Sequence, residues 1–155
     1  MTTSAVNPQW PSLSERQALL RQRFPVWQPL TLDGLLEKNA QDYPDRAIVI
    51  TDQQTWTYAQ MHAWSVQLAA GLVNKGVKPG DHVALLMANF PEFVAVKFAI
   101  AMVGAVAVPV NFLNKRDELA YVLKQSDAVM LITMDSFRNM PYWRYLDELV
   151  PNWQV

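Results

Sequence analysis

The stretch that decides the fold is residues 81–111, which read DHVALLMANFPEFVAVKFAIAMVGAVAVPVN. The apolar run His82–Met87 predicts a strand covered on both faces, and Val106–Val110 predicts a second strand. Between them, Pro91 suits the first turn of a helix that runs to about Val103. Two strands joined by one helix within about 30 residues form a βαβ unit, so the sequence predicts that the strands are parallel.

Residues at both ends of this helix predict its limits. Asn89 is expected to cap the free backbone amides at the start, and Glu92 suits the positive end of the helix dipole. Gly104 is expected to supply the left-handed residue that stops the helix. Residues 93–103 are apolar nearly all round, with Lys97 their only charge, which predicts burial on more than one side.

The flanking segments continue the alternation of helices and strands. Two extended runs around Asp52–Gln53 predict a β-hairpin over Ala47–Tyr58. Asn114 is expected to cap a helix over Lys115–Gln125, and Ala128–Thr133 has the pattern of a third buried strand. We therefore expect an α/β fold with a mainly parallel sheet, helices on both of its faces and the hairpin at its margin.

The N-terminal end of the chain has a different character. Ser12 and Glu15 fit a capping box at the start of a short helix that reaches about Arg23. Prolines interrupt the chain before the next helical pattern begins. We expect residues 1–29 to form an N-terminal arm with one short helix, and residues 30–155 to form part of a single larger domain.

Composition limits the class of protein. The chain has 155 residues, of which 51% are hydrophobic and 17% charged, so it is more apolar than a usual soluble domain. Its net charge of -1 does not point to nucleic acid or to an acidic membrane surface. The absence of cysteine excludes disulfides and thiolate chemistry. The first 15 residues hold no basic segment followed by an apolar run, so we expect no signal peptide. The sequence has no clean apolar run of about 20 residues, and we expect a cytoplasmic protein.

Four segments resemble motifs that one known family carries in the same order. The segments are Thr55–Met61, Gly76–Ala84, Ala101–Asn111 and Glu118–Ala128. Thr55–Met61 resembles that family's (S/T)-Y-x-E-L motif, with Gln60 and Met61 in place of Glu and Leu, and Gly76–Ala84 resembles its G-V-x-x-G-D-x-V-A motif. The family is that of the adenylate-forming enzymes, the acyl-CoA synthetase and AMP-binding ligase superfamily. The resemblance covers about Leu30–Val155.

This resemblance implies a ligase chemistry. The family uses Mg-ATP to activate a carboxylic acid as an acyl-adenylate and then transfers the acyl group to CoA or another thiol. Residues 109–111 and Glu118–Tyr121 look more like acyl-CoA synthetases of fatty acid metabolism than like peptide-synthetase domains. The sequence has no Ser/Thr-Gly-rich loop with a following lysine that would hold the triphosphate. The family carries that loop and its catalytic lysine farther downstream, so we expect an N-terminal fragment that is inactive by itself.

Two residues are candidates for the site of the complete enzyme. Some acyl-CoA synthetases carry arginines after the third strand that meet the phosphates of CoA, and the resemblance implies this role for Arg138. Asn139 stands where a further arginine would be expected. Asn111 is polar at the carboxyl end of a strand, where open α/β sheets bind ligands, and is the candidate substrate-binding residue. The alternative for Arg138 is a solvated surface arginine, and the alternative for Asn111 is a residue that only ends the strand. We predict no catalytic residue and no metal ligand in this chain.

Two interpretations of the whole chain remain open. One is the N-terminal fragment of an acyl-CoA synthetase, whose complete form would use ATP, Mg and CoA with a carboxylic acid. The other is a stand-alone binding or regulatory module that pairs with a separate polypeptide. A flavodoxin-type nucleotide-binding domain is disfavoured because no phosphate loop is present. We expect none of these cofactors to bind the chain tightly. We also expect self-association through apolar surface that further segments would cover, with Phe93–Val103 or a strand edge in the contact.

Overall fold

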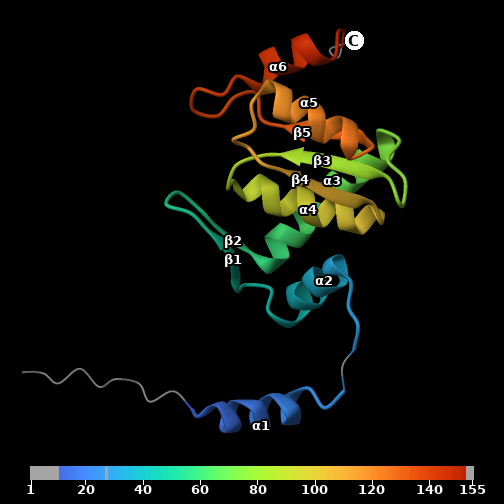
Figure 1. The fold of residues 1–155 in the computed structure, drawn as a ribbon. Helices are drawn as coiled ribbons and strands as arrows, with labels where there is room; N and C mark the ends of the chain where they lie inside the picture. Colours follow the sequence, from blue (N-terminus) through green and yellow to red (C-terminus); the bar gives the residue numbers. More distant parts are fainter. Residues whose placement is uncertain (1–10, 27, 153–155) are drawn as a thin grey trace, which may run out of the picture. The chain divides into compact units, whose positions relative to one another are not determined.

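The computed structural model describes residues 11–26 and 28–152 (Figure 1). The chain divides into two compact units, Met1–Leu30 and Thr31–Val155, and each is described by itself. The first contains helix α1, Leu13–Arg23. In chain order the second contains α2 (Leu32–Asp42), β1 (Ala47–Ile50), β2 (Thr55–Thr57), α3 (Tyr58–Asn74), β3 (His82–Leu86), α4 (Pro91–Val103), β4 (Val106–Val110), α5 (Arg116–Gln125), β5 (Ala128–Thr133) and α6 (Tyr142–Leu149).

Strand β3 lies at the centre of a three-stranded sheet whose order is β4-β3-β5. Both neighbours run parallel to it, which confirms the predicted βαβ unit. The register with β4 is regular, starting from His82 opposite Val106. The register with β5 shifts near its start, because His82 faces Ala128 and the next residue faces Met130. Val129 is therefore the extra residue of a bulge, and it is 64% exposed.

Successive residues of β3 enter two different parts of the core. Val83 and Leu85 pack with residues of α3 and α4 in one apolar cluster. Ala84 and Leu86 pack on the opposite face, in a second cluster that includes Leu119 of α5 and one residue of α6. All four strand residues are fully buried, as the alternation of side chains across a strand requires. Figure 1 shows α5 and α4 on opposite sides of this sheet, so helices cover both faces, as predicted.

Helix α4 is buried on two sides. Its residues Val96 and Ile100 belong to the cluster against the sheet. Its residues Ala95 and Phe98 belong to a third cluster, which is formed with α2, α3 and the β1–β2 hairpin. This arrangement confirms the burial expected from a helix that is apolar nearly all round. Lys97 is half-buried, and its ammonium group lies 5.8 Å from the centre of the Phe98 ring.

Both limits of α4 were predicted correctly, but the residue expected to cap its start was not. Gly104 ends the helix with a φ of 76°, in the left-handed region. At the start, the N-cap residue is Phe90, which makes no side-chain capping bond, so the expected cap by Asn89 is wrong. The backbone N–H of Phe90 donates to the carbonyl of Ala88 at 2.7 Å. This tight turn places the N-cap one residue beyond Asn89, and the helix starts at Pro91, as predicted.

Helix α5 begins one residue later than expected. Its N-cap is Lys115, and the predicted cap by Asn114 is wrong. The backbone N–H of Asn114 donates to the carbonyl of Asn111 at 3.0 Å, so this residue belongs to the turn after β4. The Glu118 carboxylate accepts a bond from the Lys115 backbone N–H at 2.9 Å. An acidic side chain thus satisfies an amide at the positive end of the helix.

Strands β1 and β2 pair antiparallel in a separate two-stranded sheet, as the predicted hairpin requires. The ring of Trp56 stacks on that of Trp64 in α3, with centroids 4.6 Å apart. Leu36 of α2 and Met61 of α3 lie in the same cluster. The hairpin is therefore held to the helices by apolar packing of Ile48, Val49 and Trp56, and it is not paired with the parallel sheet. The Trp56 indole N–H is buried without a partner in the described part of the chain.

Tyr142 attaches α6 to the end of β4. Its side chain is fully buried, and its hydroxyl donates a hydrogen bond to the carbonyl of Phe112. Burial raises the pKa of the Tyr142 hydroxyl above its ordinary value, because the charged phenolate would lose its hydration. The folded state therefore holds this proton at pH values where an unfolded chain releases it.

We expect Tyr142→Phe to lower the free energy of unfolding by roughly 1–3 kcal/mol, because the Phe112 carbonyl loses its partner. The folded-state pKa of Tyr142 is raised, so the stability of the wild type should fall as pH rises above about 10. The variant should lose less stability over that range. Urea unfolding monitored by circular dichroism, repeated from neutral to alkaline pH, measures both effects.

Tyr121→Phe is the matched control, because Tyr121 is 67% exposed and should tolerate the loss of its hydroxyl. An equal cost for the two variants, or an unchanged alkaline slope in Tyr142→Phe, would contradict the role of the buried hydroxyl.

Candidate ligand-binding edge of the sheet

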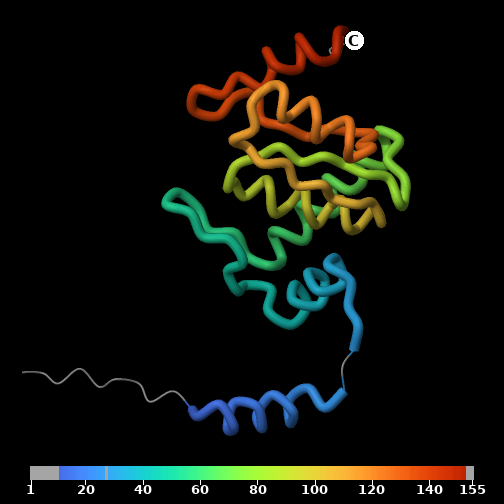
Figure 2. Tube along the Cα trace, in the orientation of Figure 1, coloured from blue at the N-terminus to red at the C-terminus, as the bar shows by residue number. Residues whose placement is uncertain are grey.

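Parallel strands end at one edge of a sheet, and this edge is where open α/β sheets bind ligands. Figure 2 shows the chain leaving β3, β4 and β5 on the same side of the sheet. Phe90 follows β3, Asn111 and Phe112 follow β4, and Phe137 and Arg138 follow β5. Both candidate residues from the sequence therefore lie at this edge, after different strands.

Three aromatic rings join the segments at this edge. The ring of Phe137 lies 5.4 Å from that of Phe112 and 6.2 Å from that of Phe90, measured between centroids. Both pairs are edge-to-face, the arrangement that the charge distribution of aromatic rings favours. Phe137 and Phe112 are the sequence neighbours of Arg138 and Asn111. The structure thus brings the two candidate segments together through their aromatic neighbours.

Sequence patterns did not predict this group of three rings. Each ring lies within a few residues of the end of a buried strand, and that position is the signal that could have found them. Phe90 is 42% exposed, so one ring of the group also faces solvent.

Asn111 closes the turn after β4. Its side-chain Oδ1 accepts a hydrogen bond from the backbone N–H of Leu113 at 3.0 Å. An asparagine that bonds to the backbone two residues later forms an Asx turn, which redirects the chain after a strand. The residue is exposed. Its oxygen thus has a structural partner, whereas its amide nitrogen takes no part in this bond.

Arg138 lies in a tight turn between Phe137 and Met140, whose backbone groups bond to each other in both directions at 2.9 and 3.1 Å. Its φ of 54° is in the left-handed region, which is uncommon for an arginine. The guanidinium carbon lies 5.3 Å from the centre of the Phe137 ring. This contact positions an exposed cation at the edge of the sheet. Arg144 lies on α6 instead, with its guanidinium 5.1 Å from the ring of Trp143.

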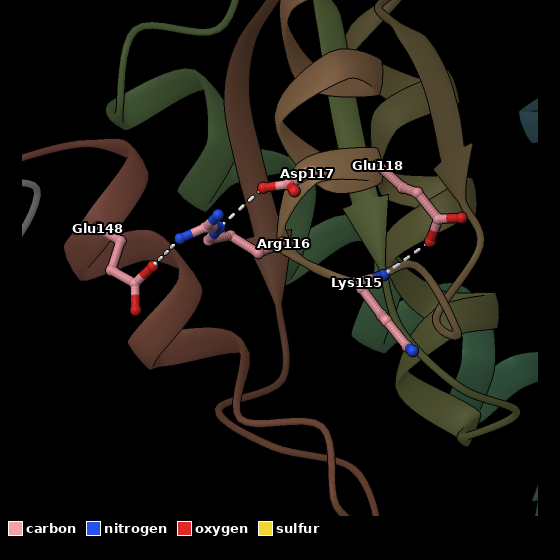
Figure 3. A network of polar contacts seen from close by, with 5 residues as sticks. All are labelled: Lys115, Arg116, Asp117, Glu118 and Glu148. Atoms are coloured by element: carbon pink, nitrogen blue, oxygen red, sulfur yellow. Dashed lines mark hydrogen bonds and ion pairs between the residues drawn. The ribbon is translucent and has the colours of Figure 1, made fainter.

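A network of charged groups ties α5 to α6 (Figure 3). Arg116 donates to Glu148 of α6 at 2.6 Å and to its neighbour Asp117 at 2.8 Å. These two hydrogen bonds raise the pKa of Arg116, and the bond to Glu148 has the larger effect. All three side chains are exposed, so the pairs orient the helices more than they stabilise the fold.

An open depression of about 450 Å³ lies over the outer face of α5. Its lining residues are Asn114, Asp117, Glu118, Tyr121 and Val122. Two of its carboxylates are already engaged, Asp117 by Arg116 and Glu118 by the backbone of Lys115. Neither Arg138 nor Asn111 lines this depression, which therefore differs from the candidate edge.

Metal ligands do not gather anywhere in the described residues. No group of three or more histidine, cysteine, aspartate or glutamate side chains there could hold a metal ion. Across residues 11–26 and 28–152, none of the helices combines the length and apolar character needed to cross a membrane.

Comparison with known proteins identifies the family. A family model described as AMP-binding enzyme matches residues 36–153. YngI of Bacillus subtilis (strain 168), named provisionally as an acyl-CoA synthetase, is 46% identical over 126 residues. That alignment covers 80% of this chain and 23% of YngI. An oxalate–CoA ligase of Arabidopsis thaliana is 38% identical over 105 residues, covering 66% of this chain and 20% of the ligase.

The fold agrees with the family match. The crystal structure of the N-terminal domain of FACL13 from Mycobacterium tuberculosis matches with a TM-score of 0.72 and 28% identity. The match covers 81% of this chain and 31% of that one. The chain thus spans less than a third of the length of each of these relatives. Together with the ordered motifs and the central parallel sheet, the match shows that the chain belongs to the family of AMP-binding, adenylate-forming enzymes.

Proposed function

We propose that this chain is the N-terminal part of an acyl-CoA synthetase. The observation that carries the proposal is the 46% identity to a relative named for this activity. In the complete enzyme, a carboxylate oxygen would attack the α-phosphate of ATP, and pyrophosphate would leave. The thiol of CoA would then attack the acyl carbonyl, lose its proton and displace AMP. A relative named as a CoA ligase supports CoA as the acceptor.

The residues of this chain fit only part of that reaction. Family members use ATP, Mg and CoA, but this sequence offers no Gly-rich loop with a following lysine for a triphosphate. We therefore assign Mg-ATP to other segments of the complete enzyme and expect none of these cofactors to bind this chain tightly. The contribution proposed for this chain is a rigid sheet edge that holds Arg138 and Asn111. We propose that the enzyme is cytoplasmic.

Arg138 is proposed to contact a phosphate of CoA. A guanidinium donates two parallel hydrogen bonds to phosphate oxygens, and its charge is not lost at any physiological pH. The strained backbone and the contact with the Phe137 ring support this role, because both fix the direction of the side chain. Asn111 is proposed to lie near the substrate, where the N–H groups of its side-chain amide could donate while Oδ1 holds the turn.

Self-association is proposed at the sheet edges. Helix α4 is covered by the sheet and by the other helices, so the outer edges of β4 and β5 are the remaining candidates. Each of these strands pairs on one side only in the described chain. Pro109 weakens β4 as a partner because proline has no N–H to donate, whereas β5 has no proline and no charge. The free edge of β5 is therefore the preferred contact.

We expect the isolated chain to show no exchange of pyrophosphate into ATP with any carboxylic acid. The physical reason is the lack of a triphosphate loop and of a catalytic lysine, which would stabilise the transferring phosphoryl group. Radiolabelled exchange in a preparation free of host synthetases measures this, with a full-length relative as the positive control. Acid-dependent exchange well above the blank would contradict the assignment of Mg-ATP to other segments.

In the complete enzyme, we expect Arg138→Ala to raise the KM for CoA by roughly tenfold, as loss of a charge-assisted hydrogen bond implies. The adenylation half-reaction, measured by pyrophosphate exchange, should change little. Arg144→Ala is the matched control, because Arg144 is also exposed and also lies over an aromatic ring. An unchanged KM in Arg138→Ala, or an equal rise in Arg144→Ala, would show that Arg138 is a solvated surface residue with no specific role in CoA binding.

A further inference from the structure

The hydrogen-bond ladder between β3 and β5 ends in a contact with sulfur. The backbone N–H of Met134 donates to the carbonyl of Leu86 at 3.3 Å. A regular parallel ladder would continue with a bond from the Ala88 N–H to the Met134 carbonyl. That carbonyl instead accepts a bond from the hydroxyl of Thr133 at 2.8 Å, and the Ala88 N–H donates to the Met134 sulfur at 3.4 Å. A side chain thus replaces the main chain in the last bond of the ladder.

The bond to sulfur satisfies a donor that water cannot easily reach. Ala88 is 3% exposed, so its N–H has little access to solvent. A thioether is a weak acceptor, but a buried N–H with no acceptor at all is strongly unfavourable. The Met134 sulfur therefore holds the end of β3 to the end of β5.

Met134 also lies where the candidate edge packs against the core. Its side chain is half-buried and packs against the same buried cluster as Phe112 and Phe137. Arg138 follows Phe137 in the chain and has its guanidinium over that ring. A movement of the Met134 sulfur would therefore reach the segment that carries Arg138.

Composition makes methionine the expected target of a peroxide. The chain has seven methionines and no cysteine, so no thiol competes for the oxidant. A thioether sulfur attacks one oxygen of hydrogen peroxide, so that a sulfur–oxygen bond forms and the oxygen–oxygen bond breaks. The sulfur loses two electrons, and the second oxygen leaves as water. The product is methionine sulfoxide, which reductases convert back to the thioether.

The bond between Ala88 and Met134 has no room for the added oxygen. A sulfur–oxygen bond is about 1.5 Å long, so an oxygen between the two atoms would lie about 1.9 Å from the Ala88 nitrogen, whereas N–H···O bonds need about 2.7 Å. To make room, the sulfur would have to move back into the packed cluster. If the oxygen points elsewhere, the sulfur carries a partial positive charge and repels the N–H. Oxidation is therefore expected to break this bond.

We propose that Met134 is a site of reversible oxidation by hydrogen peroxide, and that its sulfoxide separates the ends of β3 and β5 beside Arg138. Oxidation releases the Ala88 N–H and displaces the segment that follows β5. The oxidation site is a property of this chain alone. Its effect on CoA binding rests on the function proposed for Arg138.

The test follows hydrogen exchange of the Ala88 amide in the full chain by NMR. In the wild type, peroxide should speed this exchange about tenfold, as expected when a buried N–H loses its acceptor. Methionine sulfoxide reductase should restore slow exchange. Met134→Leu should exchange rapidly with or without peroxide, because leucine has no sulfur to accept the bond. Mass spectrometry identifies the methionines that are oxidised.

Met140→Leu is the matched control. Met140 is also half-buried and packs against the same cluster, but its backbone rather than its sulfur bonds to Phe137. This variant should respond to peroxide as the wild type does, and far-ultraviolet circular dichroism checks that both variants are folded. The proposal is overturned by slow Ala88 exchange after Met134 is oxidised, by slow exchange in Met134→Leu, or by peroxide that oxidises Met140 and spares Met134. If a variant does not fold, the wild type before and after peroxide decides by itself.

The complete enzyme tests the link to CoA separately. Peroxide should raise the KM for CoA about threefold in the wild type and in Met140→Leu. Met134→Leu should lose this sensitivity to peroxide. Fast Ala88 exchange with an unchanged KM would overturn the link to CoA and leave the oxidation site. An unchanged KM in Arg138→Ala would instead overturn the role proposed for Arg138, so the two failures are distinguishable.

Discussion

The structure depends on the burial of β3 on all four of its sides. Parallel strands flank it on both edges, and helices cover both of its faces. Residues Val83–Leu86 are fully buried without interruption. A strand in that position must be short and continuously apolar, and it needs a crossover helix for each parallel neighbour. Helices α4 and α5 are these crossover helices. Together with α3 on one face and α6 on the other, they form the two apolar clusters that meet at β3.

The same requirement creates the candidate site. Parallel neighbours deliver three connecting segments to one edge of the sheet, and their aromatic residues pack there against Phe137. Tyr142 of α6 also holds the segment after β4, because its hydroxyl donates a hydrogen bond to the Phe112 carbonyl. The edge is thus packed against the core through these contacts, while Arg138 remains exposed in its turn. This exposed cation beside the Phe137 ring is the group that we propose as a phosphate contact.

The elements that local pattern determines were predicted from the sequence, and the features that depend on tertiary contact were not. The buried strands, α4 and its end at Gly104 result from apolar periodicity and one glycine. The caps at Asn89 and Asn114 were wrong, because backbone turns specific to this fold take up the residues concerned. The aromatic group at the sheet edge joins rings from three segments distant in the chain, so no single pattern reveals it. The left-handed backbone of Arg138 is likewise imposed by the turn that joins Phe137 to Met140.

The burial of β3 from both faces is tested most directly by one set of leucine substitutions. Leu85 and Leu86 are fully buried and face opposite clusters, whereas Leu113 is 55% exposed. Urea unfolding should show that Leu85→Ala and Leu86→Ala each lower the free energy of unfolding by about 2–5 kcal/mol. Leu113→Ala should stay within about 0.5 kcal/mol of wild type. A small effect at either Leu85 or Leu86, comparable to that at Leu113, would contradict the two-sided core.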